Sequence, residues 1–242
     1  MSKPAANLGN RWWILLGVII ASACATMQAP QDYASILTNP NRPENERALD
    51  AVRKPQEVMA FYGVKKGDKV ADLYASRGYY TVILSQLVGG EGIVYAANPA
   101  ARPELHERVK HPSLANIRVI DGPLDKVALP QDGSLDLVFI HLDYHEVPRE
   151  ARIPMNRRIL NSLKRGGAYG VIDHSAKEGS GDEAAKTLHR IDKNLVVKEV
   201  TSVGFRLQKE GTMLRREDDT RDFSVTKERG RSDRFVLRFE KP

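Results

Sequence analysis

The order of the apolar segments constrains the fold of this 242-residue chain more than any other feature. Between residues 69 and 173, segments that predict strands alternate with segments that predict helices. The predicted strands are Lys69–Tyr74, Ile93–Ala97, Ile117–Ile120, Leu135–Ile140 and Ala168–Asp173, and the predicted helices are Tyr79–Val88, Glu104–Lys110 and Ile153–Lys164. A long helix containing Leu188, Ile191, Leu195 and Val196 and two closing strands, Phe205–Leu214 and Arg234–Glu240, are expected next. This order predicts an α/β domain with a doubly wound, Rossmann-like, seven-stranded sheet and an antiparallel edge strand.

The first strand leads into the stretch where we place the ligand. An apolar run that ends in an acid, Asp72, and turns into a helix resembles the first half of a nucleotide-binding βαβ unit. Glycines usually form this turn, but Tyr74 and Ser76 stand at two of the expected positions, and only Gly78 remains. A tyrosine there either blocks the ligand or turns its ring away.

Polar residues also follow the other predicted strands. In a doubly wound sheet the ligand binds beyond the carboxyl ends of the strands, where Asn98, Asp121, His141 and Asp173 fall. Asn98 can offer hydrogen bonds to ribose hydroxyls without a charge. Asp121, beside Gly122, either holds an adenine amino group or caps a turn.

The densest group of chemically capable residues follows the fourth strand, in the run His141-Leu142-Asp143-Tyr144-His145-Glu146. The fifth strand delivers Asp173-His174-Ser175 to the same edge. We expect His145 and His174 to be candidate general bases, because a neutral imidazole titrates near physiological pH, with Asp143 or Glu146 orienting the ring. The alternative is that these histidines only hydrogen-bond to loops.

The amino terminus predicts export. Lys3 and Arg11 precede an apolar run, Trp12–Ile20, and the small residues Ala21-Ser22-Ala23, so that residues 1–23 form a predicted signal peptide. The run is short for a membrane span. The single cysteine, Cys24, then resembles the lipid-modified residue of a bacterial lipoprotein, which would anchor the protein on the periplasmic side of a membrane; ordinary cleavage after Ala23 or Ala25 and a retained anchor are the alternatives.

Residues 24–43 predict a tether and residues 44–242 the folded domain. Two helices, Glu44–Val52 and Pro55–Gly63, are expected before the first strand. From these positions Arg42, Arg53 and Lys54 either reach an anionic ligand group or form a solvated surface.

The charge of the chain argues against nucleic acid as a partner. The formal net charge is +6, which becomes +4 without Lys3 and Arg11, and basic residues are interleaved with acids, as in Arg215-Arg216-Glu217-Asp218-Asp219. Neither a P-loop nor a Gly-x-Ser-x-Gly elbow is present in the sequence.

Several quoted segments resemble the class I S-adenosylmethionine-dependent methyltransferases, and more specifically a bacterial subgroup of predicted methyltransferases with export signals. The resemblance covers about residues 44 to 242 and rests on Val70-Ala71-Asp72 with Gly78, Val94–Asn98, Leu135–Phe139, Leu163-Lys164-Arg165-Gly166-Gly167 and Asp233–Phe239. It implies S-adenosylmethionine as cofactor and a small-molecule acceptor. It also implies that Asp72, Tyr74, Ser76 and Gly78 contact the methionine part, Asn98 the ribose, Asp121 with Gly122 the adenine, and that His141 lines the cleft.

Two alternatives stay open beside this resemblance. Some methyltransferases of this class bind a divalent ion, and Asp143 and Asp173 fall at comparable places, near His141, His145 and His174. A His-x-Asp-x-His spacing is a loose metal signature, so we do not expect a metal. Because S-adenosylmethionine is made in the cytosol, an exported chain of this kind is either a methyltransferase with unusual cofactor contacts or a non-catalytic binding or structural protein on a degenerate fold.

Overall fold

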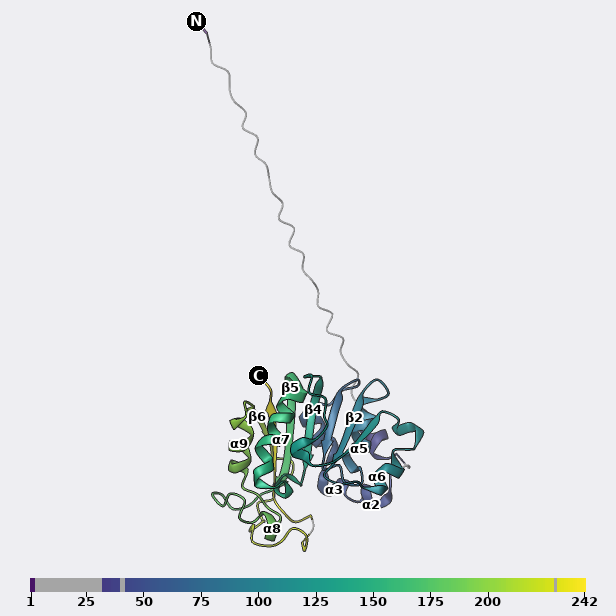
Figure 1. The fold of residues 1–242 in the computed structure, drawn as a ribbon, viewed down its shortest axis with the longest axis vertical. Coiled ribbons are helices and arrows are strands. Elements are labelled where there is room, and N and C mark those ends of the chain that lie inside the picture. Colours follow the sequence, from purple (N-terminus) through teal and green to yellow (C-terminus); the bar gives the residue numbers. More distant parts are fainter. Residues whose placement is uncertain (3–31, 40–41, 229) are drawn as a thin grey trace. The chain divides into compact units, whose positions relative to one another are not determined.

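The computed structural model describes residues 1–2, 32–39, 42–228 and 230–242. The chain divides at residue 30, and the second unit, residues 31–242, carries all the elements described below (Figure 1). Cys24, residues 3–23 of the predicted signal peptide and half of the predicted tether lie outside the described residues. None of the described helices is both long and apolar enough to cross a membrane.

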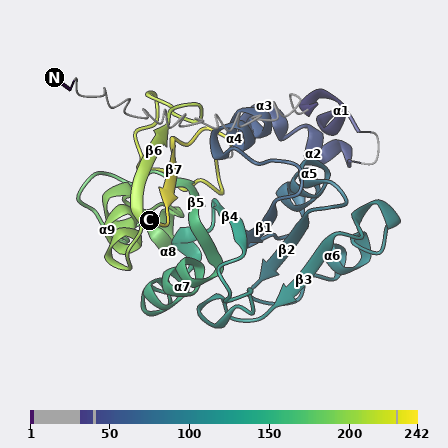
Figure 2. The same cartoon turned by 90° about the horizontal axis from the view of Figure 1, so that it is seen from above.

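A seven-stranded sheet forms the centre of the fold and confirms the predicted class. Its strands stand in the order β3-β2-β1-β4-β5-β7-β6 (Figure 2). They are β1 (Lys69–Leu73), β2 (Ile93–Asn98), β3 (Ile117–Asp121), β4 (Leu135–His141), β5 (Leu163–His174), β6 (Arg206–Gly211) and β7 (Arg234–Glu240). The pairs from β3 to β5 are parallel, whereas β7 runs antiparallel to both of its neighbours, β5 and β6. The antiparallel strand is therefore second from the edge.

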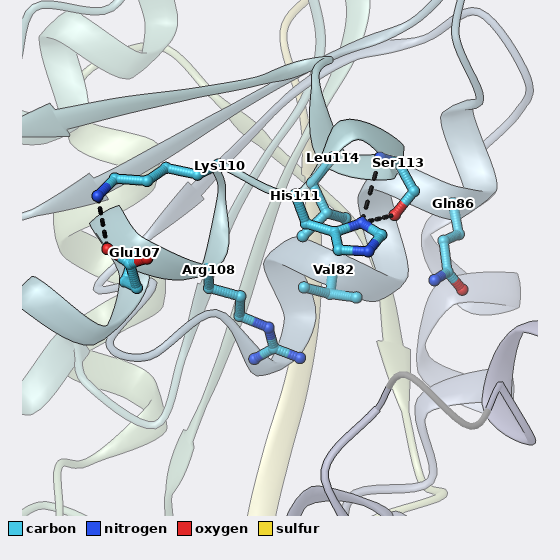
Figure 3. Close-up of a pocket in the computed structure, with 8 residues that line it drawn as sticks. All are labelled: Val82, Gln86, Glu107, Arg108, Lys110, His111, Ser113 and Leu114. Atoms are coloured by element: carbon cyan, nitrogen blue, oxygen red, sulfur yellow. Dashed lines mark hydrogen bonds and ion pairs between the residues drawn. The ribbon is translucent and has the colours of Figure 1, made fainter.

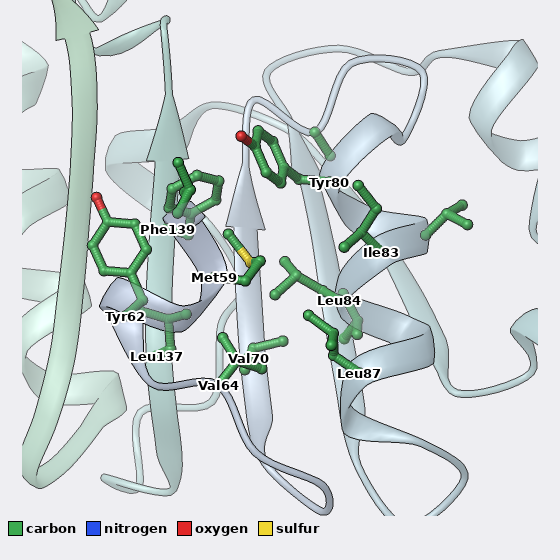
Figure 4. Packing of buried hydrophobic residues seen from close by; sticks show 14 of the residues in the cluster. Met59, Tyr62, Val64, Val70, Tyr80, Ile83, Leu84, Leu87, Leu137 and Phe139 are labelled. Carbon is green, nitrogen blue, oxygen red and sulfur yellow. The ribbon is translucent and has the colours of Figure 1, made fainter. Parts of the chain in front are cut away.

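Helices cover both faces of the sheet (Figure 2). On one face α4 (Pro55–Tyr62) and α5 (Tyr79–Val88) pack against Val70, Phe139 and Ile172 (Figure 4). On the other, α7 (Arg149–Ser162) and α9 (Lys193–Ser202) pack against the alternate residues of the same strands, such as Ile140 and Val171. Strands buried on both faces explain the continuous apolar runs in the sequence. The remaining elements are α6 (Pro103–Arg108) and the 3₁₀ turns η1 (Pro112–Leu114), η2 (Leu124–Lys126) and η3 (Tyr144–Glu146).

Two predicted helices are broken in the structure. The long helix expected around Leu188 to Val196 is instead α8 (Ala185–Leu188) and α9, because His189 adopts a left-handed conformation with φ 56° and Ile191 forms a bridge with Ser175. The helix expected over Glu44–Val52 is divided into α2 (Glu44–Arg47) and α3 (Asp50–Arg53). Two elements, α5 and β7, have the predicted bounds.

The segment before α2 belongs to the folded domain rather than to an extended tether. It contains α1 (Tyr33–Leu37), and Tyr33, Ile36 and Leu37 pack against the core on the side of α4 and α5. Arg42 is 1% exposed and forms two hydrogen bonds of 2.8 Å with the carboxylate of Asp50. The suggestion that Arg42 reaches a ligand is thus wrong, since its charge is used to fix this segment to α3.

Candidate functional site

The loop between β1 and α5 keeps the backbone of a glycine-rich turn although two of its glycines are replaced. Tyr74 has φ 55°, Ser76 has φ 53° and Gly78 has φ 91°. Residues with side chains rarely adopt this left-handed region, and each such residue costs about 1 kcal/mol or more. Gly78 has no alternative, because a Cβ at this position would approach Leu105 Cδ1 to 2.9 Å.

The ring of Tyr74 does not occupy the side of the loop that faces α5. It packs against the core cluster on the α7 face of the sheet, and burial together with the nearby Asp143 carboxylate raises the pKa of its hydroxyl to about 12. Of the two possibilities for Tyr74, the structure therefore shows the one in which the ring turns away from the α5 side of the loop. The loop backbone of Ser76 and its neighbours is therefore not covered from the α5 side by this ring.

Asn98, at the end of β2, fastens the loop instead of standing free. Its Oδ1 accepts a hydrogen bond of 2.8 Å from the Ser76 backbone N–H, and its Nδ2 donates one of 3.3 Å to the Ser76 carbonyl oxygen. The residue is 1% exposed. The ribose contact implied for Asn98 is therefore not seen in this arrangement, since both polar atoms of the side-chain amide are used by the loop.

Asp72 faces α5 rather than the loop. Its Oδ2 accepts a hydrogen bond of 2.6 Å from the Thr81 hydroxyl, and burial raises the pKa of its carboxyl to about 7. Asp121 is in register with Asn98 at the end of β3, and its Oδ2 lies 2.6 Å from His106 Nε2 and remains partly accessible. Gly122 donates its backbone N–H to the Asn98 carbonyl oxygen. Asp121 and Gly122 thus lie next to the loop, where the adenine contact was predicted.

The buried carboxylate of Asp173 organises the residues after β4. It accepts hydrogen bonds from the His145 backbone N–H and from His145 Nδ1, both of 2.8 Å, and one of 2.7 Å from the His174 backbone N–H. On the other side of the ring, His145 Nε2 lies 3.1 Å from Glu146 Oε1, which is also 2.7 Å from His189 Nδ1. A chain of alternating acids and imidazoles results.

This chain changes the role predicted for His145. Burial by itself lowers the pKa of the imidazole, but the carboxylates of Asp173, Glu146 and Asp143 raise it to about 9. His145 is therefore charged near neutral pH and has no free nitrogen to accept a proton. This arrangement does not favour the predicted role of general base, and the His145 ring instead holds the loop after β4.

Unlike His145, His174 is uncharged near physiological pH, and Asp143 titrates close to it. Burial, opposed by Asp173, lowers the pKa of His174 to about 3, so the ring is neutral, and its Nδ1 lies 2.6 Å from the Ser232 hydroxyl. Burial, reinforced by the Asp173 charge, raises the pKa of Asp143 to about 7. Of the three predicted catalytic residues, Asp143 is the one that exchanges a proton near physiological pH.

His141 ends β4 on the α5 face and lines the same edge. It is 8% exposed, its ring meets the Tyr80 ring edge to face at a centroid distance of 4.6 Å, and burial keeps its pKa well below the usual range. Within the described part of the chain, Nε2 of His141 has no hydrogen-bond partner. A buried nitrogen without a partner is expected where a ligand completes the site.

The structure brings together a different set of metal-ligand atoms from the one considered in the sequence. Asp173 is engaged by His145 and His174, whereas ligand atoms of His145, Glu146 and His189 lie within 4.8 Å of one another. Sequence reasoning missed His189 because the residue follows a helix break that the apolar pattern did not predict. It also gave no signal for Arg234, whose surroundings depend on strand pairing.

A cavity of about 490 Å³ lies away from this edge of the sheet. It lies beside Val82 and Gln86 of α5 and is closed by residues from Glu107 to Leu114 (Figure 3). Gln86 and Ser113 also line a neighbouring cavity that reaches Gly90 and Ile93, where β2 begins. This hollow is therefore near the amino ends of the strands and does not contain the predicted site residues.

Comparison with known proteins relates the chain to methyltransferases. No protein-family model matches the sequence. The chain is 25% identical over 144 residues to a protein-L-isoaspartate O-methyltransferase of Ignicoccus hospitalis, covering 59% of this chain and 63% of the relative. It is 28% identical over 126 residues to a demethylmenaquinone methyltransferase of Listeria welshimeri, covering 51% of this chain and 52% of the relative. The match thus spans between about half and two thirds of these relatives.

Solved structures share the fold over most of the chain. A SAM-dependent methyltransferase from Aquifex aeolicus superposes with a TM-score of 0.60 at 20% identity, covering 83% of this chain and 99% of the other. Geranyl diphosphate C-methyltransferase from Streptomyces coelicolor A3(2) gives a TM-score of 0.62 at 12% identity, covering 86% and 84%. The strand order with an antiparallel seventh strand is the same class I methyltransferase fold.

Proposed function

We propose that this chain, which has the class I methyltransferase fold, is an S-adenosylmethionine-dependent methyltransferase that acts on a small molecule. The observation that carries the proposal is the conformation of the loop after β1. Tyr74 and Ser76 hold the left-handed backbone that glycines would adopt, so the shape of a cofactor loop persists in spite of the altered residues. Distant sequence similarity to methyltransferases supports the same conclusion.

The residues present fit a polar cofactor at the carboxyl edge. The loop of residues 74–78 would face its methionine part, Asp121 and Gly122 its adenine, and the unpartnered Nε2 of His141 lies on the same edge. When bound, the cofactor supplies an electrophilic methyl group. The protein's own contribution is to orient the acceptor and to remove its proton.

Asp143 is the residue that we propose to remove that proton. Its carboxylate would accept the proton that the acceptor's hydroxyl or amine loses as its oxygen or nitrogen bonds to the methyl carbon and the bond from that carbon to the sulfonium sulfur breaks. A pKa of about 7 makes both protonation states accessible during a cycle. Asp173 supports this step by fixing η3 through the backbone N–H and the ring of His145.

A non-catalytic binding protein on the same fold is the second candidate. The observation that favours it is the engagement of Asn98, which spends both amide atoms on Ser76 and leaves the end of β2 without a free acid or amide for a ribose. Under this alternative the loop is preserved for stability alone.

Calorimetric titration with S-adenosylmethionine and S-adenosylhomocysteine separates the two candidates. We expect binding by the wild type and by Ser76→Gly, which retains access to the left-handed region. Ser76→Val should weaken binding about tenfold or more, because a β-branched residue disfavours that conformation. Absence of heat at millimolar ligand with the wild-type chain would exclude the methyltransferase.

We further propose that the protein is exported and anchored to a membrane through acylated Cys24, on the strength of the sequence around that residue. Cys24→Ser should then move the protein from the membrane fraction to the soluble periplasmic fraction. An unchanged distribution in fractionation experiments would count against acylation.

A further inference from the structure

The pairing of β4, β5 and β7 places three basic side chains on one face of the sheet. His141 is in register with Ile172 of β5, and His174 of β5 is in register with Arg234 of β7. Residues in register, and residues two apart on one strand, project to the same face. His141, His174 and Arg234 therefore follow one another along the carboxyl edge on the face covered by α4 and α5.

Arg234 is an exception among the buried arginines of the described chain. Arg42 is paired with Asp50, Arg152 with Asp182 and Glu199, and Arg190 with Asp219. Arg234 is only 5% exposed, yet among the described residues it has no ion-pair partner, and its Nε has no hydrogen-bond partner. A buried guanidinium without an anion is costly, so a charged partner from outside the chain is expected.

The nearest acid does not neutralise Arg234. Asp233 precedes it, but one oxygen of this carboxylate is 3.2 Å from Arg215 Nε and the other is 3.1 Å from Arg221 Nη2. Arg53 adds a further unpaired charge on the same side of the molecule. Its guanidinium lies over the Tyr79 ring, 4.3 Å from the centroid, and no acid among the described residues forms an ion pair with it.

Arg234 lines a cavity of about 150 Å³ between α3 and the connection from β6 to β7. The cavity is lined by basic and apolar residues, and acids are absent from its lining: Lys54, Arg215, Arg216 and Arg234 are basic, and Ala51, Val52, Met213, Leu214 and Gly230 complete it. Arg215 and Arg216 are paired with Asp233 and Asp218, and Lys54 Nζ lies 4.0 Å from Glu57 Oε1. Arg234 is therefore the basic side chain of this lining that has no ion-pair partner among the described residues, and a guanidinium binds a phosphate or carboxylate group with two hydrogen bonds.

We propose that this cavity binds the anionic group, a phosphate or a carboxylate, of the methyl acceptor. The inference rests on the proposed methyltransferase function. Arg234 is the link between the two sites, because it reaches the cavity and stands opposite His174 at the carboxyl edge. An acceptor held at Arg234 by its oxyanion would extend its other end along that edge toward His141 and the cofactor loop. The substrate class is thus a small phosphorylated or carboxylated molecule.

The test is a calorimetric titration of the full chain with inorganic phosphate and, separately, with benzoate. We expect binding of at least one probe, with the dissociation constant raised about tenfold or more in Arg234→Gln. Arg165→Gln, which removes an exposed charge from the amino end of β5, should change it less than about twofold, as expected for a remote surface charge. Lys54→Gln, at an exposed position of the cavity wall, provides a second variant that does not alter the core.

A parallel titration with S-adenosylhomocysteine assigns the anion. Wild type and Arg234→Gln should bind this probe equally. An equal loss for phosphate and S-adenosylhomocysteine would show that Arg234 holds the cofactor's own carboxylate and would overturn the proposal, as would failure of both phosphate and benzoate to bind the wild type. Phosphate binding that depends on Arg234 in a chain that binds no S-adenosylhomocysteine would refute the methyltransferase function and, with it, the acceptor as the source of the anion.

Discussion

At the scale of single residues, the charges around Asp173 decide which side chains can exchange protons. The sequence places His145, His174 and Asp143 at one edge, and the structure confirms that proximity. The sequence alone does not predict that the His145 ring is held between Asp173 and Glu146, because that arrangement depends on the turn of η3 and on a contact between residues 28 positions apart. His145, which its residue type predicts to be the base, is therefore charged. Asp143, which was predicted to orient that ring, has a pKa of about 7.

Two carboxyl groups should titrate near neutral pH. Burial raises the pKa of both Asp72 and Asp143 to about 7, so each is protonated below that pH and ionised above it. Carbon-detected NMR of the aspartate carboxyls should show two such resonances, one lost in Asp72→Asn and the other in Asp143→Asn. With an acceptor in hand, methyl transfer should fall as the pH drops through 7, and Asp143→Asn should lower kcat about 100-fold. A titration of Asp143 near pH 4 would contradict its assignment as the base.

The unpaired charge of Arg234 should reduce stability when no anion is bound. Arg234→Met is expected to raise the free energy of unfolding by about 1 kcal/mol, because it removes a buried charge that lacks a partner. Arg190→Met is the matched comparison and should lower it by about 3 kcal/mol or more, since Asp219 would remain buried and unpaired. Urea unfolding in phosphate-free buffer measures both. Equal destabilisation by the two substitutions would show that Arg234 is compensated.

At the scale of elements, the loop between β1 and α5 shows what a pattern can and cannot predict. The strand, the turn and the start of α5 at Tyr79 were predicted from apolar periodicity and from Gly78. The conformation of Tyr74 and Ser76 was not, because the side chain that stabilises it, Asn98, comes from the next strand. The break between α8 and α9 is marked by neither Gly nor Pro; its local signal is Asp192, whose side chain caps the start of α9 by accepting a hydrogen bond from the Asn194 backbone N–H.

Loss of the Asn98 amide should loosen the cofactor loop. Asn98→Ala removes both side-chain hydrogen bonds to the backbone of Ser76 and is expected to lower the free energy of unfolding by about 1 to 3 kcal/mol and the affinity for S-adenosylhomocysteine about tenfold. Asn116→Ala provides the control, because Asn116 similarly fastens Ser85 and Gly89 on the far side of α5. It should cost comparable stability and leave the affinity unchanged. If both variants bind alike, Asn98 has no part in shaping the site.

At the scale of the whole molecule, the fold was predictable because the order of strands and helices leaves few topologies. The strand ends were correct to within a residue for β1 to β4, including β3, which lies at the edge of the sheet and is only partly buried. The amino-terminal boundary was not predictable in the same way. Arg42 and α1 look like a polar tether in sequence, and only the ion pair of Arg42 with Asp50 and the packing of α1 against the core make them part of the domain.

The whole domain should lose stability in mildly alkaline solution. The pKa of His145 is raised in the folded protein from 6.5 to about 9. The stabilisation that its protonated ring gives to the folded state is therefore complete below pH 6.5 and is lost as the pH rises through 9. The free energy of unfolding should fall by up to roughly 3 kcal/mol across this range. Urea unfolding at several pH values measures the slope, and His145→Gln should flatten it. A slope that is unchanged in this variant would assign the alkaline loss to other groups.

The position of β7 between β5 and β6 has a consequence for how the protein is made. Residues 234–240 are late in the sequence but fill a slot inside the sheet, with hydrogen-bonded neighbours on both sides. Until residues 234–240 have left the ribosome, β5 and β6 each have an unpaired edge, and the sheet is incomplete between them. A chain that stops a few residues early is therefore not a slightly shortened protein but one with a gap between two open strands, which proteases and aggregation would remove.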